Sequence, residues 1–248
     1  MTEQFHSERY YLSAGECGPE RQMPVPLIAS RMIEVATHHA NLIGVGYDDL
    51  IANGQAWVLS RLTIEMKRYP EINETYSVAT WVEGVNRHFS ERNFEISDHT
   101  GATIGYGRSV WVAIDIERRT VADISRFTVL GDMICERPCP IERQGRHRPV
   151  TSPPDLTASY IFRYCDLDFN RHVNSARYIE LLLNQWPLEF HDRHSISRIE
   201  ISYLHEAHFG DEARIAIADD SSTGESLCNI EVGGKLSCHA KIMFTKRK

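Results

Sequence analysis

Long apolar runs are missing from this sequence of 248 residues. No stretch reaches the roughly 18 apolar residues that a membrane-spanning helix needs, which argues against a membrane as partner. Residues 1–20 are polar and lack the apolar core of a secretory signal, so we expect a cytoplasmic protein. Basic residues are in the minority, since 27 Lys and Arg face 34 Asp and Glu, for a formal charge of −7. That balance argues against nucleic acid as a partner.

Paired cysteines are missing as well. The six cysteines, at positions 17, 135, 139, 165, 228 and 238, form no C-x-x-C pair, so we expect free thiols in a reducing compartment. The sequence also contains no dinucleotide fingerprint, no phosphate-binding loop and no metal-ligand spacing, which predicts neither a cofactor nor a bound metal. What is present is ordinary for a globular protein, with 42% hydrophobic and 25% charged residues, and this excludes overall disorder.

Two segments have the 3.6-residue apolar period of a helix, and they stand among segments with the alternating pattern of strands. The helices are expected at residues 27–43, with Gly44 as C-cap, and 174–186, with Pro187 ending the second. The strands are expected at 8–14, 57–69, 76–82, 89–116 as a hairpin, 159–164, 196–203, 213–218, 226–232 and 235–245. This order predicts an α+β fold with a helix and an antiparallel sheet in each half.

The second half of the sequence repeats the first. Residues 60–64 match residues 197–201 at an offset of 137, and residues 31–34 match residues 177–180 at an offset of 146. Two matches in the same order favour an internal duplication. We expect an N-terminal domain at 1–130 that encloses substrate, an irregular proline-rich linker at 131–158 and a catalytic C-terminal domain at 159–248.

The densest polar cluster precedes the second helix. Asn174 is suited to cap that helix with its side-chain oxygen. If the preceding segment is extended, Asp168, Asn170 and His172 fall on one side of it, beside a helix N-terminus with its unpaired N–H groups. A carboxylate, an amide and an imidazole beside such donors are the parts of an acyl-transfer site, although a solvated polar loop is the plainer alternative. The segment that leads into the first helix, residues 21–26, has no such cluster, so we expect catalysis in the second half of the chain.

Residues 166–180 resemble the signature of the acyl-acyl carrier protein thioesterases, which reads D-x-N-x-H-V-N-N/S-x-x-Y. Four N-terminal landmarks resemble the same family, in the segments 57–61, 68–70, 80–82 and 109–112. The resemblance extends over about residues 8–245. It implies two tandem hotdog domains, each an antiparallel β-sheet wrapped around a central α-helix. It also implies hydrolysis of fatty acyl-acyl carrier protein to free fatty acid and carrier protein, which ends fatty-acid elongation.

Catalytic roles follow from the resemblance where residues match. Asp168, Asn170 and His172 fall on the family's catalytic positions, and Glu206 matches a later acidic one. We expect Glu206 to activate water as a general base or to attack the thioester directly, a choice that the sequence leaves open. Asn170 would position Glu206 or the water, and His172 would donate to the oxyanion or the leaving thiolate. Asp168 would orient the groups around it.

Three further expectations concern the surroundings of these residues. The backbone N–H groups of Val173 and Asn174 are expected to polarise the thioester carbonyl. Ala207 occupies the position at which many plant members have cysteine, which excludes a cysteine nucleophile there. The acyl chain is expected to contact the first helix, at Met32, Val35, Ala36 and His39.

Other functions also fit these residues. An acyl-CoA thioesterase or a non-catalytic acyl-binding regulatory protein would use the same fold. A hydratase is disfavoured because Arg171 stands where that group has proline. The expected partner is acyl carrier protein, for a monomer or a homodimer. The linker contains four arginines, Arg137, Arg143, Arg146 and Arg148. They either guide docking of the acidic carrier protein or are merely solvated.

Overall fold

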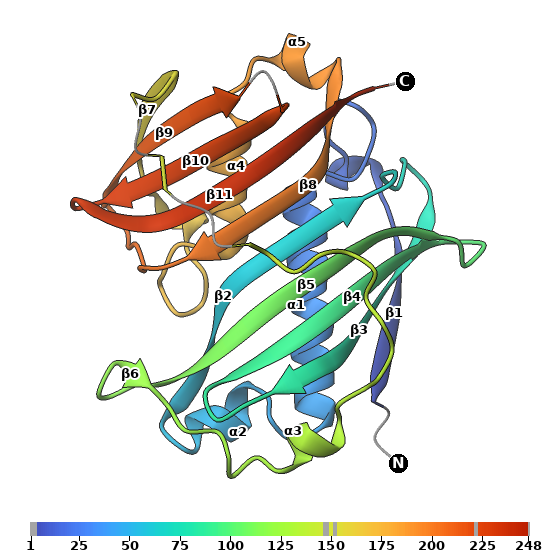
Figure 1. The fold of residues 1–248 in the computed structure, drawn as a ribbon, viewed down its shortest axis with the longest axis vertical. Helices are drawn as coiled ribbons and strands as arrows, with labels where there is room; N and C mark the ends of the chain where they lie inside the picture. The colour runs from blue at the N-terminus through green and yellow to red at the C-terminus, as the bar shows by residue number, and fades with distance from the viewer. Residues whose placement is uncertain (1–3, 146–148, 151–152, 221–222, 248) are drawn as a thin grey trace. The chain divides into compact units, whose positions relative to one another are not determined.

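The computed structural model describes residues 4–145, 149–150, 153–220 and 223–247. The chain forms two compact units, Met1–Arg143 and Gln144–Lys248. Each unit contains an antiparallel sheet with a helix against one face, α1 in the first unit and α4 in the second (Figure 1). The expected α+β composition, with one main helix and one antiparallel sheet in each half, is confirmed. None of the described helices is long and apolar enough to span a membrane.

The first unit orders its main strands β1-β3-β4-β5-β2, and β6 pairs with β5. Its elements are β1 (Phe5–Tyr11), η1 (Ala14–Glu16), α1 (Val25–Leu42), α2 (Tyr47–Ile51), β2 (Gln55–Met66), β3 (Thr75–Val85), β4 (Phe89–Asp98), β5 (Thr103–Asp115), β6 (Thr120–Val121) and α3 (Val129–Asp132). Pro26 stands at the second position of α1, where a missing N–H does no harm. The C-cap residue of α1 is Ile43, one position before the predicted Gly44. Gly44 follows it with φ 72°, the left-handed conformation in which glycine ends a helix without strain.

The apolar face of α1 packs closely on the sheet. Met32 is fully buried, and its methyl group lies against Gly107 on β5. A Cβ atom on Gly107 would stand 2.0 Å from Met32 Cε, so any other residue here would force the Met32 side chain to move. The interior at this point is therefore filled by protein side chains.

The second unit orders its strands β8-β11-β10-β9-β7. Its elements are β7 (Leu156–Ile161), η2 (Tyr164–Asp166), α4 (Ser175–Leu183), α5 (Leu188–His191), β8 (His194–Tyr203), β9 (Glu212–Asp220), β10 (Glu225–Val232) and β11 (Lys235–Lys246). The side chain of Asn174 accepts the N–H of Ala176 at 2.9 Å, which confirms the predicted N-cap of α4. Ile179 and Leu182 on this helix are fully buried.

The end of α4 differs from the prediction. The helix ends at Leu183 and not at Trp186. Trp186 precedes a proline, which disfavours a helical backbone conformation at that residue. The indole instead lies beside Phe190 and Phe244, with ring centroids 6.0 and 5.0 Å away. Strand β7 also starts earlier than expected, at Leu156 inside the predicted linker.

The first part of the predicted linker is packed against the first unit. Cys139 and Ile141 are buried, and their carbonyl oxygens accept hydrogen bonds from Arg108 at 2.8 and 2.9 Å. The fully buried Trp81 donates its indole N–H to the carbonyl of Arg137 at 3.0 Å. This stretch is therefore a strap that packs on β3 and β5. Its described residues between α3 and β7 form no helix or named strand, so the stretch is irregular as predicted, but it is packed on the first unit.

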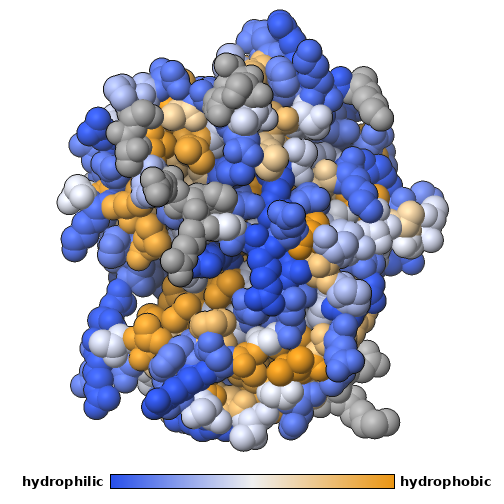
Figure 2. All heavy atoms as spheres, viewed as in Figure 1, coloured by the Kyte–Doolittle hydropathy of each residue, from blue (hydrophilic) through white to orange (hydrophobic). Residues whose placement is uncertain are grey.

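The linker arginines that the structure describes pair within their own unit. Arg137 lies 2.5 Å from Glu95 and stacks over Trp81. Arg143 lies 3.1 Å from Glu91 and also contacts Glu83. Such pairs fit the largely hydrophilic surface of Figure 2, which is interrupted by smaller apolar patches. Arg146 and Arg148 lie outside the described residues, and a role of the four arginines in docking stays a prediction.

Candidate active site

The loop that leads from β7 into α4 is compact. The N–H of Asp168 donates to the carbonyl of His172 at 2.8 Å, and the N–H of Arg171 donates to the carbonyl of Asp168 at 3.0 Å. Arg171 takes φ 66°, in the left-handed region. The expectation that residues 166–174 run extended, with polar side chains aligned by alternation, is therefore wrong. Residues 168–172 form a tight turn.

Asp168 holds this turn with its side chain. Its Oδ1 accepts the backbone N–H of Asn170 at 2.9 Å and that of His172 at 3.1 Å. This is the usual way in which an Asp side chain stabilises a turn two residues ahead. Asp168 thus orients His172 through the backbone, while the side chain of Asn170 lies exposed at the tip.

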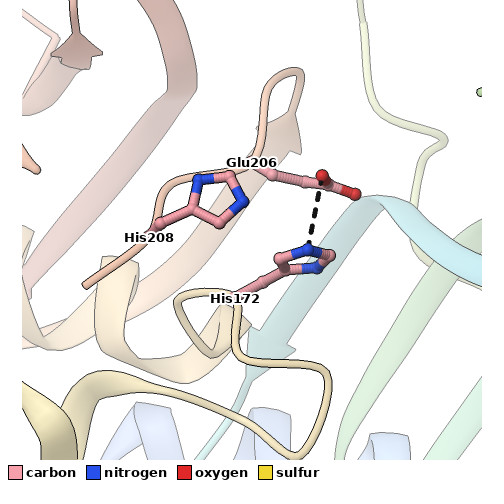
Figure 3. Close-up of side chains that lie close together, drawn as sticks. All are labelled: His172, Glu206 and His208. Carbon is pink, nitrogen blue, oxygen red and sulfur yellow. Dashed lines mark ion pairs between the residues drawn. The ribbon is translucent and has the colours of Figure 1, made fainter.

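A second loop, after β8, brings Glu206 to this turn. His172 and His208 form an antiparallel bridge, and the N–H of Val173 donates to the carbonyl of Ala207 at 2.8 Å. These backbone links place His172 Nε2 3.5 Å from Glu206 Oε2 (Figure 3). The two side chains are 27% and 26% exposed, so they are partly desolvated but open to a substrate. Of the predicted catalytic residues, the structure brings these two side chains together.

The predicted oxyanion donors are already engaged. The N–H of Val173 is bonded to Ala207, and the N–H of Asn174 donates to the carbonyl of Asp166 at 2.8 Å. Both N–H groups thus already have a backbone carbonyl as hydrogen-bond acceptor, as backbone donors inside a folded protein generally do. The expectation that Val173 and Asn174 polarise a thioester carbonyl is therefore wrong in this conformation.

Two tyrosines, the buried Tyr178 and the partly buried Tyr203, fix the Glu206 loop to the start of α4. Tyr203 donates its hydroxyl to the carbonyl of Ser175 at 3.1 Å. Tyr178 hydrogen-bonds with the backbone of Ala207. Burial raises the pKa of both Tyr178 and Tyr203 above the usual range, so their hydroxyl groups stay protonated at any ordinary pH. They support the site by position and not by proton transfer.

Sequence reasoning missed His208. Its ring centroid lies 5.1 Å from that of His172, edge to face at 89°. Figure 3 shows the His172 ring below the Glu206 carboxylate and the His208 ring to one side of both. His208 follows Glu206 by two residues, and residues two apart in an extended segment point to the same side. This spacing is the feature of the sequence that could have identified His208.

The first unit has the same backbone without the same side chains. There the N–H of Gly18 donates to the carbonyl of Gln22 at 2.9 Å, Arg21 takes φ 61°, and Gln22 is bridged to Glu71. Gly18, Gln22 and Glu71 thus stand where the second unit has Asp168, His172 and His208. The matching turns support the predicted duplication. They are offset by 150 residues, whereas residues 31–34 and 177–180 match at an offset of 146.

Comparison with known families decides the identity of this arrangement. The acyl-ACP thioesterase N-terminal domain matches residues 3–128, and the acyl-ACP thioesterase C-terminal domain matches residues 154–246, where ACP is acyl carrier protein. The chain belongs to the acyl-ACP thioesterase family. The predicted family resemblance is confirmed over both halves.

Solved structures of this family have the same fold. An acyl-ACP thioesterase from Bacteroides thetaiotaomicron is 33% identical, covers 98% of each chain and superposes with a TM-score of 0.90. The 12:0-ACP thioesterase from Umbellularia californica is 20% identical and superposes with a TM-score of 0.87 over 100% of this chain and 99% of that chain. The expected pair of hotdog domains is confirmed.

Curated acyl-ACP thioesterases are more distant in sequence. The chloroplastic oleoyl-ACP thioesterase 1 of Arabidopsis thaliana is 27% identical over 92% of this chain. The chloroplastic palmitoyl-ACP thioesterase of the same plant is 25% identical over 93% of this chain. This thioesterase-family chain spans 65% and 58% of the length of those two relatives.

The predicted substrate-binding residues lie inside the first hotdog domain. All four are buried on α1, namely Met32, Val35, Ala36 and His39. His39 Nδ1 is 2.9 Å from Arg92 Nη1, and its ring stacks on His6 at 5.8 Å. Burial lowers the pKa of Arg92 to about 10. This part of the interior is thus apolar at Met32 and polar at His39, and contact of these residues with an acyl chain stays a prediction.

Proposed function

We propose that this chain hydrolyses the thioester of fatty acyl-ACP to free fatty acid and ACP, and so ends elongation of the acyl chain. The observation that carries the proposal is the His172–Glu206 pair, with Nε2 and Oε2 3.5 Å apart and both side chains partly exposed. A carboxylate beside an imidazole is suited to general base and general acid chemistry. The family membership and the Bacteroides thetaiotaomicron structure support acyl-ACP as the substrate class.

In the first mechanistic route, Glu206 accepts a proton from a water molecule as the water oxygen attacks the thioester carbonyl. The C–S bond then breaks, and His172 supplies a proton to the departing sulfur. The proton on Glu206 returns to His172 across their short separation, which restores both groups. The sum is addition of one water across the C–S bond, giving a carboxylic acid and a thiol.

In the second route, a Glu206 oxygen attacks the carbonyl carbon and expels the thiolate, which takes a proton from His172. Water then hydrolyses the resulting anhydride to the free fatty acid and the Glu206 carboxylate, and the proton that this hydrolysis releases returns to His172. In both routes Asp168 holds the backbone of His172 in place, and Asn170 orients Glu206 or the attacking water. Since the N–H groups of Val173 and Asn174 are engaged, we assign stabilisation of the oxyanion to the His172 side chain.

The test is thiol release from a chain-length series of acyl-ACP and acyl-CoA thioesters. Wild type is compared with Asn170→Ala and Glu206→Ala, and circular dichroism confirms that each variant is folded. Turnover of the ACP series that is lost in Glu206→Ala and reduced in Asn170→Ala supports the proposal. Faster turnover of the CoA series would replace ACP by CoA as the carrier. Tight binding of acyl chains without turnover would leave a regulatory acyl-binding protein.

Partner and location follow from this proposal. Acyl-ACP is the partner through its thioester, and a monomer or a homodimer is expected because two hotdog domains are fused in one chain. A cytoplasmic location stays a prediction, and the relatives from Arabidopsis thaliana are chloroplastic.

A further inference from the structure

Three side chains in the second unit converge on one point. One ligand atom each from His172, Glu206 and His208 lies within 4.8 Å of the others. In Figure 3 the His172 ring and the Glu206 carboxylate face each other across the marked ion pair, and the His208 ring lies beside them. Two imidazole nitrogens and one carboxylate oxygen are a donor set that zinc and similar transition-metal ions prefer.

The separation of His172 and Glu206 fits such an ion. Zinc binds nitrogen and carboxylate oxygen at about 2.0–2.2 Å, so two ligands of a tetrahedral ion stand about 3.3–3.5 Å apart. His172 Nε2 and Glu206 Oε2 are 3.5 Å apart, beyond the 2.7–3.2 Å of an ordinary hydrogen bond. The ligand atom of His208 lies within 4.8 Å of the other two, so its side chain must rotate to bind the same ion, and it has room to do so because it is 56% exposed.

An outer carboxylate supports the third donor. His208 Nδ1 is 3.6 Å from Asp211 Oδ2, and the same carboxylate oxygen accepts the backbone N–H of His208 at 2.8 Å. Metal-binding histidines commonly have a carboxylate on the ring nitrogen that does not bind the ion, since it fixes the orientation of the ring. Asp211 leaves Nε2 of His208 to face the other two donors.

We propose that His172, Glu206 and His208 bind a divalent transition-metal ion of the zinc type, and that the bound ion blocks thioester hydrolysis. The binding site stands on the geometry alone, and the block rests on the proposed function. An ion held by His172 and Glu206 occupies the imidazole nitrogen and the carboxylate oxygen that would otherwise move protons. Mg²⁺ prefers octahedral oxygen ligands and does not fit this site.

The test measures binding and activity separately. Isothermal titration with Zn²⁺ is carried out on wild type, His208→Ala and Asp211→Asn, and hydrolysis of acyl-ACP is followed with Zn²⁺, with Mg²⁺ and after addition of a chelator. Hydrolysis by each variant is also measured without added metal, so that a loss of Zn²⁺ binding is distinguished from a loss of catalysis. Cys165→Ser controls for the exposed thiol on the neighbouring loop, and His205→Ala controls for an exposed histidine beside the cluster.

We expect one Zn²⁺ per chain, and inhibition that the chelator reverses and Mg²⁺ does not reproduce. Asp211→Asn should weaken Zn²⁺ binding about 10–100-fold, as loss of an outer carboxylate usually does, and His208→Ala should weaken it more. Cys165→Ser and His205→Ala should bind and respond as wild type does. No binding, binding that His208→Ala leaves intact, binding lost in Cys165→Ser, or activation by Zn²⁺ would overturn the proposal. Binding with the expected variant pattern in a chain without thioesterase activity would confirm the site and refute the proposed function.

Discussion

Single residues at the site act mostly through the backbone. His172 and Glu206 face each other because the bridge between His172 and His208 and the bond from Val173 to Ala207 join their two loops. Asp168 contributes two hydrogen bonds to the same turn. The proposed chemistry thus uses a carboxylate and an imidazole, but their placement depends on residues that need not touch substrate.

Replacement of Asp168 separates these roles. Asp168→Ala removes the acceptor of two N–H groups and lets His172 shift, so we expect kcat to fall about 100-fold while KM changes little. Asp168→Asn keeps an oxygen at the same point and should recover most of the loss. The readout is steady-state hydrolysis of one acyl-ACP. If Asp168→Asn is as impaired as Asp168→Ala, the charge of Asp168 matters and the positioning role is refuted.

Gly107 tests the packing of the first core. Gly107→Ala places a methyl group against Met32, which must move, and we expect the free energy of unfolding to fall by about 1–3 kcal/mol. Gly15→Ala is the matched control, since no atom lies within 4 Å of its added Cβ. Urea unfolding of the two variants beside wild type measures the difference. Equal stability of both variants would show that the contact with Met32 is not tight.

At the scale of elements, α4 is short and depends on its ends. It has nine residues, Ser175–Leu183, and its first turn is closed by the Asn174 side chain. A helix of this length has little stability of its own, so its cap and its buried face hold it in place. The loop that carries His172 leads directly into this cap, which couples the stability of the helix to the geometry of the site.

Removal of the cap should be measurable. Asn174→Ala leaves the N–H of Ala176 without its acceptor, and we expect the free energy of unfolding to fall by about 1 kcal/mol. Asn184→Ala, at the exposed C-terminal end of the same helix, should change it by less than about 0.5 kcal/mol. Urea unfolding followed by the fluorescence of Trp186, in the same unit, reports both. A larger loss in Asn184→Ala would contradict the assignment of the cap.

Elements with local signals were predictable from sequence. The N-cap at Asn174 and the left-handed glycine that ends α1, Gly44, follow from the chemistry of those residues, although the C-cap itself is Ile43. The turn at residues 168–172 was not predictable, because a non-glycine residue at positive φ, Arg171, gives no sequence signal. Alternating polar residues suggested an extended segment, whereas hydrogen bonds within the turn and to Ala207 decide its shape.

At the scale of the whole molecule, the two units have the same turn before the main helix, but only the second has the polar side chains of the proposed site. The turn of the first unit has Gly18 and Gln22 where the second has Asp168 and His172. The repeat was visible in sequence because strand and helix motifs match in order. The pairing of His172 with Glu206 was available only through the family resemblance, since 34 residues separate them in the sequence. His208 and the occupied N–H groups of Val173 and Asn174 needed the structure.

Stability of the molecule should depend on pH through Glu8. Burial acts to raise the pKa of Glu8, but hydrogen bonds from His6, Tyr10 and His38 prevail and lower it from 4.5 to about 2. Because the folded-state pKa lies below the unfolded value, this stabilisation is complete above pH 4.5 and is lost as the pH falls towards 2. Glu8→Gln should therefore lower the free energy of unfolding at pH 7 by about 1–3 kcal/mol. The decrease in this free energy between pH 4.5 and pH 2 should also be smaller in Glu8→Gln than in wild type.

The control for this prediction is Glu117→Gln, which changes an exposed carboxylate of the same unit. Urea unfolding of wild type and both variants at a series of pH values gives the three profiles. A profile of Glu8→Gln that runs parallel to wild type would contradict the assigned cause.

The central claim is that the His172–Glu206 pair of the second unit carries out thioester hydrolysis. The most direct test is the kcat for acyl-ACP of Glu206→Gln beside Glu71→Gln, which changes an exposed carboxylate on the matching loop of the first unit. We expect Glu206→Gln to lose about 10²–10⁴-fold with its fold intact, and Glu71→Gln to remain close to wild type. Full activity in Glu206→Gln would contradict the account.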